Sequence, residues 1–172
     1  MIGYTAGVKL VLVRHGRAQE RALLQRDRTR ELTPEGRRRM RKAGVGLQTL
    51  VPGLAVLATS PLVRAQQTAE LIARAYGGGL DITELPSLVP GEPMNAILAW
   101  LREQPADVTL ALVGHEPDLG RLGSWLLSGK KTGFLQFRKG AAALIEFSGA
   151  PAAGNGSLVW LLTAAQLAKV AT

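Results

Sequence analysis

The chain contains two histidines, and each follows an apolar run that predicts a buried β-strand. His15 follows residues 8–13 and Arg14, whereas His115 follows residues 108–113 and a glycine. A single histidine at a strand end is more often structural than catalytic. Two histidines at equivalent strand ends, close to arginine or glycine, reverse that expectation and indicate a shared site.

A third apolar run, residues 54–58, leads to a predicted helix that carries Arg64 one turn from its start. In an open parallel sheet, ligands bind at the carboxyl ends of the strands. The predicted topology therefore places four side chains together at this edge of the sheet: Arg14, His15, Arg64 and His115. An arginine at such an edge favours an anion, because its guanidinium presents a fixed fork of donors that matches phosphate.

These residue types suit phosphoryl transfer. A neutral imidazole attacks phosphorus and forms a covalent phosphohistidine, which water then hydrolyses. We expect Arg14 and Arg64 to lower the pKa of His15 and to hold the phosphate oxygens on which charge accumulates. A protonated His115 would add a charged donor. Gly16 is by default a turn glycine, but it also lets a substrate approach the backbone, and we include it among the substrate-binding residues.

Other chemistries fit the sequence less well. The chain has no cysteine, which excludes disulfides, thiolate metal sites and cysteine nucleophiles. The two histidines with Glu116 and Asp118 could be imagined as metal ligands. However, there is no His-Glu-x-x-His run, and the nearby arginines would repel a cation, so we expect no metal. The sequence also lacks a phosphate-binding P-loop and the Gly-x-Ser-x-Gly frame of a hydrolase elbow.

Strand and helix patterns alternate along the chain, which predicts an α/β fold of three layers, with helices on both faces of a mostly parallel sheet. Thr33 with Pro34, and Ser60 with Pro61, are the expected N-caps and first-turn prolines of two helices. The tail should add strands at an edge of the sheet, with residues 149–156 as a surface loop. The expected strands are residues 8–13, 54–58, 80–85, 108–113, 135–137, 142–147 and 158–162, and the expected helices are residues 34–50, 61–76, 94–103 and 117–127.

The length of 172 residues suits one domain, which we place at residues 1–172. No apolar run approaches the roughly 20 residues that cross a bilayer. The first residues also lack the basic start and long apolar core of a secretion signal. We therefore expect a cytoplasmic protein without membrane contact.

The net charge of +8 raises the alternative of a nucleic-acid-binding protein. Aromatic residues are scarce, which argues against a platform on which single-stranded bases would stack. Much of the excess charge lies in Arg37, Arg38, Arg39, Arg41 and Lys42, which we interpret as a solvated helix face. A basic surface would equally attract an anionic substrate or an acidic partner protein.

Four stretches resemble, in chain order, the histidine phosphatase superfamily, also called the phosphoglycerate mutase-like superfamily. Residues 13–16, Val-Arg-His-Gly, resemble its Arg-His-Gly signature. Residues 27–36 resemble the Asp-x-x-Arg-x-Leu-Thr-x-x-Gly stretch of the SixA-type protein phosphohistidine phosphatases. Residues 60–69 and 112–117 are similar to the Ser-Pro-x-x-Arg-Ala-x-x-Thr-Ala and Val-Gly-His-x-Pro motifs of that group. The resemblance covers the chain from about residue 8 to residue 122.

The resemblance implies a phosphoglycerate mutase-like fold and no metal or organic cofactor. It makes His15 the nucleophile that becomes phosphorylated. It also has Arg14 and Arg64 bind the phosphate, and it places His115 opposite His15 in contact with the phosphoryl group.

Larger members of the superfamily carry an acid between the second arginine and the second histidine, and Glu92 is the best candidate for it here; the alternative is a solvated loop glutamate. The short interval leaves an open site that can admit a side chain presented by another protein. We therefore expect a phosphatase that hydrolyses phosphohistidine on a protein. The alternatives are a phosphatase of small phosphomonoesters with the same nucleophile, and a non-catalytic module that binds phosphate or nucleic acid.

Overall fold

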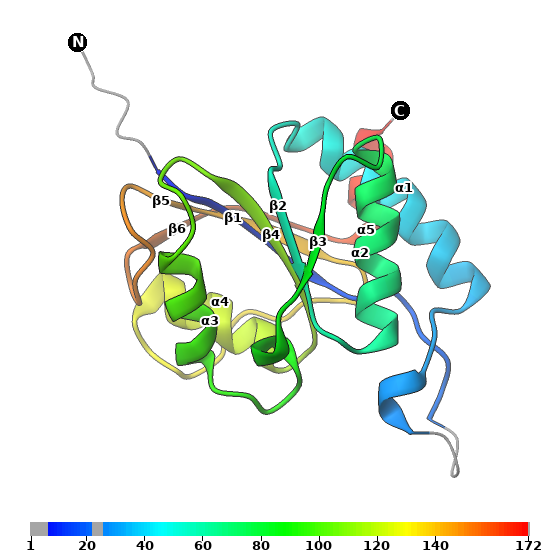
Figure 1. The fold of residues 1–172 in the computed structure, drawn as a ribbon, viewed down its shortest axis with the longest axis horizontal. Helices are drawn as coiled ribbons and strands as arrows, with labels where there is room; N and C mark the ends of the chain where they lie inside the picture. Colours follow the sequence, from blue (N-terminus) through cyan, green and yellow to red (C-terminus); the bar gives the residue numbers. More distant parts are fainter. Residues whose placement is uncertain (1–6, 22–25, 172) are drawn as a thin grey trace.

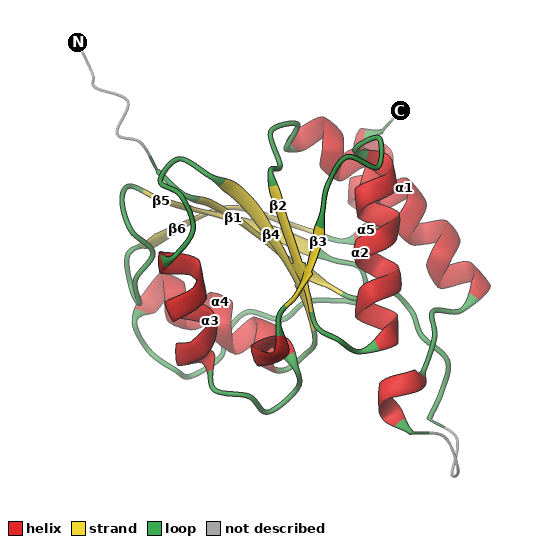
Figure 2. Ribbon diagram, viewed as in Figure 1, coloured by secondary structure: helices red, strands yellow, loops and turns green. Residues whose placement is uncertain are grey.

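The computed structural model describes residues 7–21 and 26–171, and in these ranges six strands form one sheet between two groups of helices (Figures 1 and 2). The strands are β1 (Lys9–Arg14), β2 (Val56–Thr59), β3 (Ile82–Glu84), β4 (Thr109–Gly114), β5 (Ala142–Phe147) and β6 (Gly156–Leu162). The helices are α1 (Pro34–Leu50), α2 (Val63–Ala75), α3 (Met94–Arg102), α4 (Asp118–Ser128) and α5 (Ala164–Val170), with short 3-10 helices η1 (Asp27–Thr29) and η2 (Pro86–Leu88).

The strand order is β3-β2-β4-β1-β5-β6. The four strands from β3 to β1 are parallel, whereas β5 and β6 add antiparallel strands beyond β1. β1 and β4 pair in register up to Arg14 opposite Gly114, and His15 and His115 are the next residues along. The amide of His15 still donates to the carbonyl of Gly114, at 3.1 Å. The mostly parallel, three-layer α/β/α fold is thus confirmed.

Successive side chains of β1 enter two different cores, as the two-residue period of a strand requires. Leu10 and Leu12 belong to the core that α3 and α4 cover, whereas Val11 and Val13 belong to the core that α1, α2 and α5 cover (Figure 2). All four side chains are buried. Because both faces of the sheet are covered, residues 10–13 of the strand form an uninterrupted apolar run.

The two predicted N-caps have different outcomes. Helix α1 begins at Pro34, and the side chain of Thr33 accepts a hydrogen bond from the amide of Gly36, so the first prediction is confirmed. The second is wrong, because α2 begins at Val63, after Leu62, and not at Pro61. The buried hydroxyl of Ser60 accepts a hydrogen bond from the amide of Leu62, just before the helix, and lies 2.8 Å from the imidazole of His115.

The tail differs from its prediction in two places. β5 and β6 extend the sheet at its edge as expected, but residues 135–137 form no strand. Their backbone is held by side chains, since the amide of Leu135 donates to Ser124 and the amide of Phe137 donates to Glu116. The sequence analysis also missed α5, which packs on α1 where the Cα of Gly46 meets the backbone of Leu167.

Most of the expected surface loop at residues 149–156 has no regular structure, and Gly156 is already the first residue of β6. Among the helices of the described residues, none combines the length and the apolar character that crossing a membrane requires.

Candidate active site

Four predicted side chains meet at the carboxyl ends of β1, β2 and β4. Arg14 ends β1 and His15 follows it, Arg64 lies in the first turn of α2, and His115 follows β4. The two imidazole rings have their centroids 5.0 Å apart and are tilted by 54°. His15, Arg64 and His115 are only 7%, 4% and 3% exposed, so the site lies below the surface.

The hydrogen bonds of His15 define its tautomer. Its Nδ1 lies 2.7 Å from the carbonyl oxygen of Gly16. A carbonyl oxygen only accepts, so Nδ1 carries the proton and Nε2 of the neutral ring keeps its lone pair. The Nε–H of Arg64 donates to this Nε2 at 3.3 Å. His15 therefore presents an unprotonated nitrogen beside a guanidinium.

Burial keeps this ring neutral. It is the largest cause that lowers the pKa of His15 to about 3, followed by repulsion from the protonated form of His115 and then from Arg64 and Arg14; only the Gly16 carbonyl opposes them. The sequence argument expected the arginines to lower this pKa, and they do so as the minor contribution.

The ring of His115 is also held neutral and is bonded on one side. Burial first, and then the charges of Arg64 and Arg14, lower its pKa to about 3. Its Nε2 lies 2.8 Å from the hydroxyl of Ser60. Its Nδ1 is buried and has no hydrogen-bond partner among the described residues. A buried polar atom without a partner favours a ligand group at that point.

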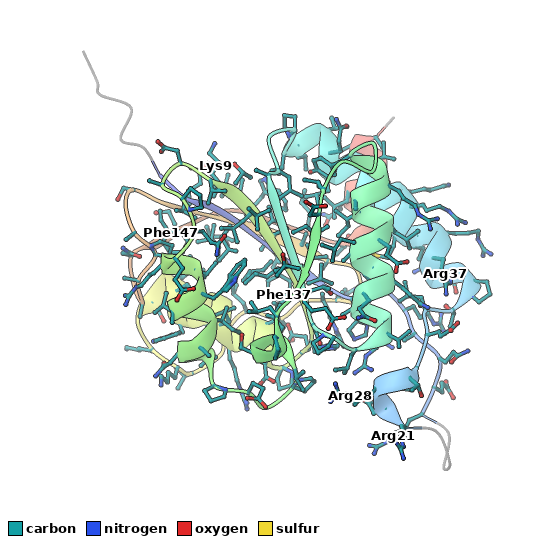
Figure 3. The ribbon with its side chains drawn as sticks, in the orientation of Figure 1. Lys9, Arg21, Arg28, Arg37, Phe137 and Phe147 are labelled. Atoms are coloured by element: carbon teal, nitrogen blue, oxygen red, sulfur yellow. The ribbon has the colours of Figure 1, made fainter. Side chains whose placement is uncertain are left out.

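Two arginines flank the histidines, and each is anchored by a different loop. Nη1 of Arg14 donates to the carbonyl of Phe137 at 2.7 Å. Phe137 is labelled near the middle of the molecule in Figure 3. Nε of Arg14 is buried and has no partner among the described residues. Arg64 donates through Nη1 to the carbonyl of Asp27, at 2.8 Å, and through Nη2 to the carboxylate of the same residue, at 3.0 Å. These bonds fix both guanidinium groups.

The sequence analysis did not identify Asp27 as part of the site, although the residue opens one of the four stretches that carry the resemblance. Burial alone would raise the pKa of Asp27, but the hydrogen bonds and charges of Arg64 and Arg30 outweigh burial and lower it. The carboxylate is therefore ionised at neutral pH and ties η1 to α2. Ser60 and Thr68 were not identified as site residues either, although both are fixed positions of the Ser-Pro-x-x-Arg-Ala-x-x-Thr-Ala stretch at residues 60–69.

The structure places Gly16 in packing contacts. Its amide donates to the hydroxyl of Thr68 at 3.0 Å. A Cβ at this position would lie 2.6 Å from Cγ of Met40, so the side chain of Met40 would have to shift to admit a larger residue. Packing against Met40 thus favours glycine here, and the amide is already paired.

Glu92 lies at the edge of the site, in the exposed turn between η2 and α3. It lines the same small cavity as His115. On the other side of the site, a cavity of about 430 Å³ opens beside Arg14, and Glu116 forms part of its wall. Burial raises the pKa of Glu116, against the opposing effects of the Phe137 amide and the charge of Arg14.

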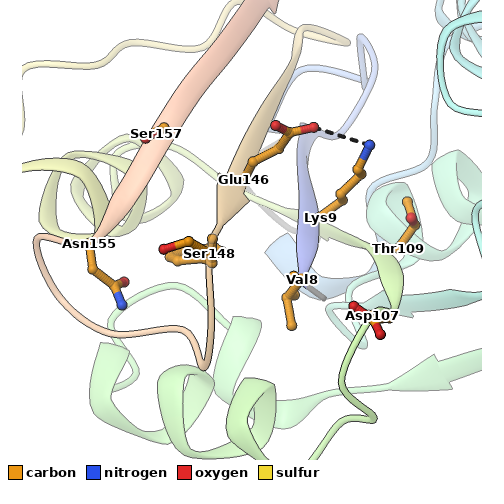
Figure 4. A pocket seen from close by; sticks show the side chains of 10 residues that line it. Val8, Lys9, Asp107, Thr109, Glu146, Ser148, Asn155 and Ser157 are labelled. Carbon is orange, nitrogen blue, oxygen red and sulfur yellow. Dashed lines mark ion pairs between the residues drawn. The ribbon is translucent and has the colours of Figure 1, made fainter. Parts of the chain in front are cut away.

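A larger cavity, of about 600 Å³, lies at the opposite end of β1 (Figure 4). Its wall includes Lys9 and Glu146, which form an ion pair of 3.2 Å. Lys9 is six residues before His15, or about 20 Å along an extended strand. This cavity holds neither histidine, so it is separate from the site described above.

Within the described ranges, no three histidine or carboxylate side chains gather closely enough to hold a metal ion. The chemistry that the site supports is instead that of a neutral imidazole beside two anchored guanidinium groups. Such groups attract a tetrahedral oxyanion and hold its oxygens while the imidazole attacks.

Comparisons with known proteins agree with this reading. The family profile of the histidine phosphatase superfamily (branch 1) matches residues 10–89. An uncharacterized protein of a Picosynechococcus species is 37% identical over 147 residues, which cover 80% of this chain and 88% of the relative. The chain therefore belongs to the histidine phosphatase superfamily and is a phosphatase.

Solved structures agree on the fold. The protein histidine phosphatase SixA, complexed with tungstate, has a TM-score of 0.79 and 24% identity, with 92% of this chain and 99% of that one covered. A Nakamurella protein named after SixA has a TM-score of 0.72 and 26% identity, covering 91% and 95%. The phosphoserine phosphatase of Entamoeba histolytica has a TM-score of 0.69 and 17% identity, covering 93% and 99%.

Proposed function

We propose that this phosphatase hydrolyses phosphohistidine on a protein, through a covalent phosphohistidine formed on His15. One observation carries the proposal. The bond from Nδ1 of His15 to the Gly16 carbonyl leaves Nε2 unprotonated, 3.3 Å from Nε of Arg64. A nucleophile that is neutral well below pH 7 needs no base to activate it for attack on phosphorus.

In the first step, Nε2 of His15 forms a bond to phosphorus while the bond from phosphorus to the substrate imidazole breaks. The departing nitrogen takes the bonding electron pair. When the other nitrogen of that imidazole is protonated, the group leaves as a neutral histidine side chain. Little help from a general acid is then required, in contrast to the departure of an alkoxide.

The flanking groups would stabilise the charge on the three equatorial oxygens. Nε of Arg64 loses its acceptor when Nε2 of His15 becomes bonded to phosphorus, so its N–H turns to a phosphoryl oxygen. Nε of Arg14 and Nδ1 of His115 are buried and have no partner among the described residues, and both would find one in the phosphoryl group. The approaching dianion raises the pKa of His115 and favours its protonated form as a donor.

In the second step, a water molecule attacks phosphorus and the bond from phosphorus to Nε2 of His15 breaks. One proton of the water passes to the solvent, inorganic phosphate is released, and His15 returns to its neutral form with the proton still on Nδ1. Across both steps, phosphohistidine and water become histidine and phosphate.

The choice of a protein substrate is supported by the short connection between α2 and β4. Between α2 and β4, the chain forms only β3, η2 and α3, with no inserted subdomain over the histidines. A side chain on another protein can reach such a site, whereas a small phosphate ester would favour more enclosure. The similarity to SixA, a protein histidine phosphatase, agrees with this choice.

The test is to trap the phosphoenzyme. Wild type and His15→Asn are incubated with a radiolabelled phosphohistidine protein and with p-nitrophenyl phosphate, in the presence of a chelator. We expect an acid-labile phosphoenzyme and phosphate release from wild type, and loss of both in His15→Asn. Release from the ester alone would refute the phosphohistidine substrate, and a phosphoenzyme in His15→Asn would refute the nucleophile.

A phosphatase of small phosphomonoesters is the second candidate, and the position of Glu92 favours it. Glu92 lines the same small cavity as His115, where it could protonate a leaving alkoxide. In that case Glu92→Gln should lower ester hydrolysis by about 10²-fold or more, with much less effect on phosphohistidine. Equal losses for both substrates would show that Glu92 does not act as the acid that protonates the leaving alkoxide.

A further inference from the structure

The positive charge of the chain is concentrated in one segment next to the nucleophile. Residues 17–42 contain ten arginines and lysines against four carboxylates, so the segment carries a net +6 of the chain's +8. The segment begins two residues after His15 and includes η1 and the first half of α1. The rest of the chain is nearly balanced.

The position of η1 is fixed by the active site itself. Asp27, the first residue of η1, accepts two hydrogen bonds from Arg64, whose Nε lies 3.3 Å from Nε2 of His15. Arg26 and Arg28 are the immediate neighbours of Asp27 in the chain, so their Cα atoms each lie about 3.8 Å from its Cα. These two residues are therefore held at the margin of the active site, and we call them the rim arginines.

Among the other basic residues of the segment, Arg17, Arg30, Arg37 and Arg39 form ion pairs with carboxylates. Arg17 and Arg39 pair with Glu35, at 3.1 and 2.6 Å. Arg26 and Arg28 are exposed, and in the part of the chain that the structure describes their side chains make no ion pair or hydrogen bond. In Figure 3, Arg28 lies at the end of the molecule that η1 forms. Two fixed positions thus carry unneutralised charge.

We propose that the rim arginines dock an acidic segment of the protein that presents the phosphohistidine. This inference rests on the proposed function, and it names the chemistry of the partner. Unpaired charges at the edge of an interface mainly accelerate encounter and select partners of opposite charge. The Debye length is about 8 Å at physiological ionic strength. Carboxylates of the partner that lie close to its phosphohistidine would therefore interact most strongly with the rim arginines.

An acidic protein fits this surface better than a nucleic acid. Residues 17–42 contain no aromatic side chain on which bases could stack. The carboxylates of Glu31 and Glu35 interrupt the basic surface of the segment, and they would repel a continuous chain of phosphates. The site that adjoins the rim also takes a single phosphoryl group, which a folded partner can insert from its own surface.

The test uses two synthetic peptides with the same central phosphohistidine. One has flanks rich in aspartate and glutamate, and the other has flanks of serine and glycine. Affinity is measured by fluorescence anisotropy on a His15→Asn background, which cannot turn the peptides over. Phosphate release is measured separately with an intact His15, so that docking and hydrolysis have independent readouts.

The decisive variant is Arg26→Glu/Arg28→Glu, with Arg26→Gln/Arg28→Gln as the milder form. The matched control is Arg74→Glu/Lys130→Glu, which makes the same change in net charge at two exposed positions. Arg74 lies ten residues beyond Arg64, or about 15 Å along α2. Lys130 lies beyond the far end of α4, which begins at the site.

We expect the starting protein to bind the acidic peptide about tenfold more tightly at low salt, with the preference disappearing near 0.5 M salt. The Glu variant should lose or invert the preference, the Gln variant should reduce it, and the control should keep it. Hydrolysis of p-nitrophenyl phosphate checks that each variant with His15 intact is folded.

Equal affinities for the two peptides, or a preference that survives in the Glu variant, would overturn the docking surface. Competition by a single-stranded RNA oligonucleotide at micromolar concentration, lost in the Glu variant, would reassign the surface to nucleic acid. If the acidic peptide binds preferentially but neither peptide releases phosphate, the docking surface stands and the proposed hydrolysis fails.

Discussion

At the scale of single residues, His15 and His115 share one small buried space, so the charge of either ring acts on the other. With ring centroids 5.0 Å apart, two imidazolium ions would repel strongly, and burial already disfavours the first of them. The pair therefore remains neutral in the protein alone. An oxyanion between the rings reverses this preference, because it attracts a proton to the side that faces it.

This pairing predicts the titration of the two rings. In a protein labelled with ¹⁵N-histidine, neither ring should titrate between pH 5 and pH 8, and His15 should show the Nδ1–H tautomer. Tungstate, as a phosphate mimic, should raise the pKa of His115 above about 3. The chain has only these two histidines, so the spectrum needs little assignment. A midpoint near 6.5 for either ring would contradict the structure.

Sequence reasoning found Arg14, His15, Arg64 and His115 because topology alone brings the ends of parallel strands together. It missed the residues that hold them, since a motif marks a position without saying which distant residue that position contacts. Asp27 and Arg64, for example, are 37 residues apart. Its expectation of Gly16 as a substrate contact stays a prediction, but the amide of this residue already donates to Thr68.

At the scale of elements, α5 depends on a gap in the surface of α1. A Cβ on Gly46 would lie 1.8 Å from the carbonyl oxygen of Leu167, so the two helices approach at a distance that only glycine permits. The capping box formed by Thr163 and Gln166 begins α5 at this point. Together these features hold the C-terminal helix against one core of the sheet.

Gly46→Ala should therefore destabilise the fold, because α5 must move or strain. Overpacking of this kind costs about 1–3 kcal/mol, which corresponds to a decrease in Tm of roughly 2–12 °C for a chain of this size. The control is Gly53→Ala, since a Cβ there meets nothing within 4 Å. Calorimetry of both variants decides the matter, and an unchanged Tm for Gly46→Ala would mean that the helices do not pack so closely.

The elements that the sequence predicted well are those that local signals specify. Thr33 and Pro34 begin α1 without help from the rest of the chain. Ser60 and Pro61 present the same signal, yet Ser60 bonds to His115, which follows a different strand. In the tail, Leu135 and Phe137 suggest a strand. Their amides donate instead to the side chains of Ser124, in α4, and of Glu116, which precedes α4. Only tertiary contacts decide such segments.

At the scale of the whole molecule, two buried neutral histidines make stability depend on pH. Each has a folded pKa of about 3, whereas the unfolded chain binds its proton near pH 6.5. Above pH 6.5 both states are neutral and the histidines have no effect on stability. As the pH falls from 6.5 toward 3, the unfolded chain gains protons that the folded protein excludes, so stability decreases.

Urea unfolding at pH 7 and pH 5 should show this loss in the wild type. The variant His15→Asn/His115→Gln keeps a polar side chain at each position but cannot titrate. Between pH 7 and pH 5, its free energy of unfolding should change less than that of the wild type. The difference between the two proteins should be up to about 1.4 kcal/mol per pH unit for each histidine replaced. Equal pH dependence in both proteins would show that the histidines do not cause the loss.

β1 lies in the interior of the sheet, paired with β4 on one side and β5 on the other. Amides in such a position exchange with heavy water only through the rarest, global opening of the fold. The strand that leads to His15 should thus be the slowest part of the molecule to exchange. Any adjustment that admits a large partner therefore occurs outside this strand, and the backbone that leads to the nucleophile stays fixed while it occurs.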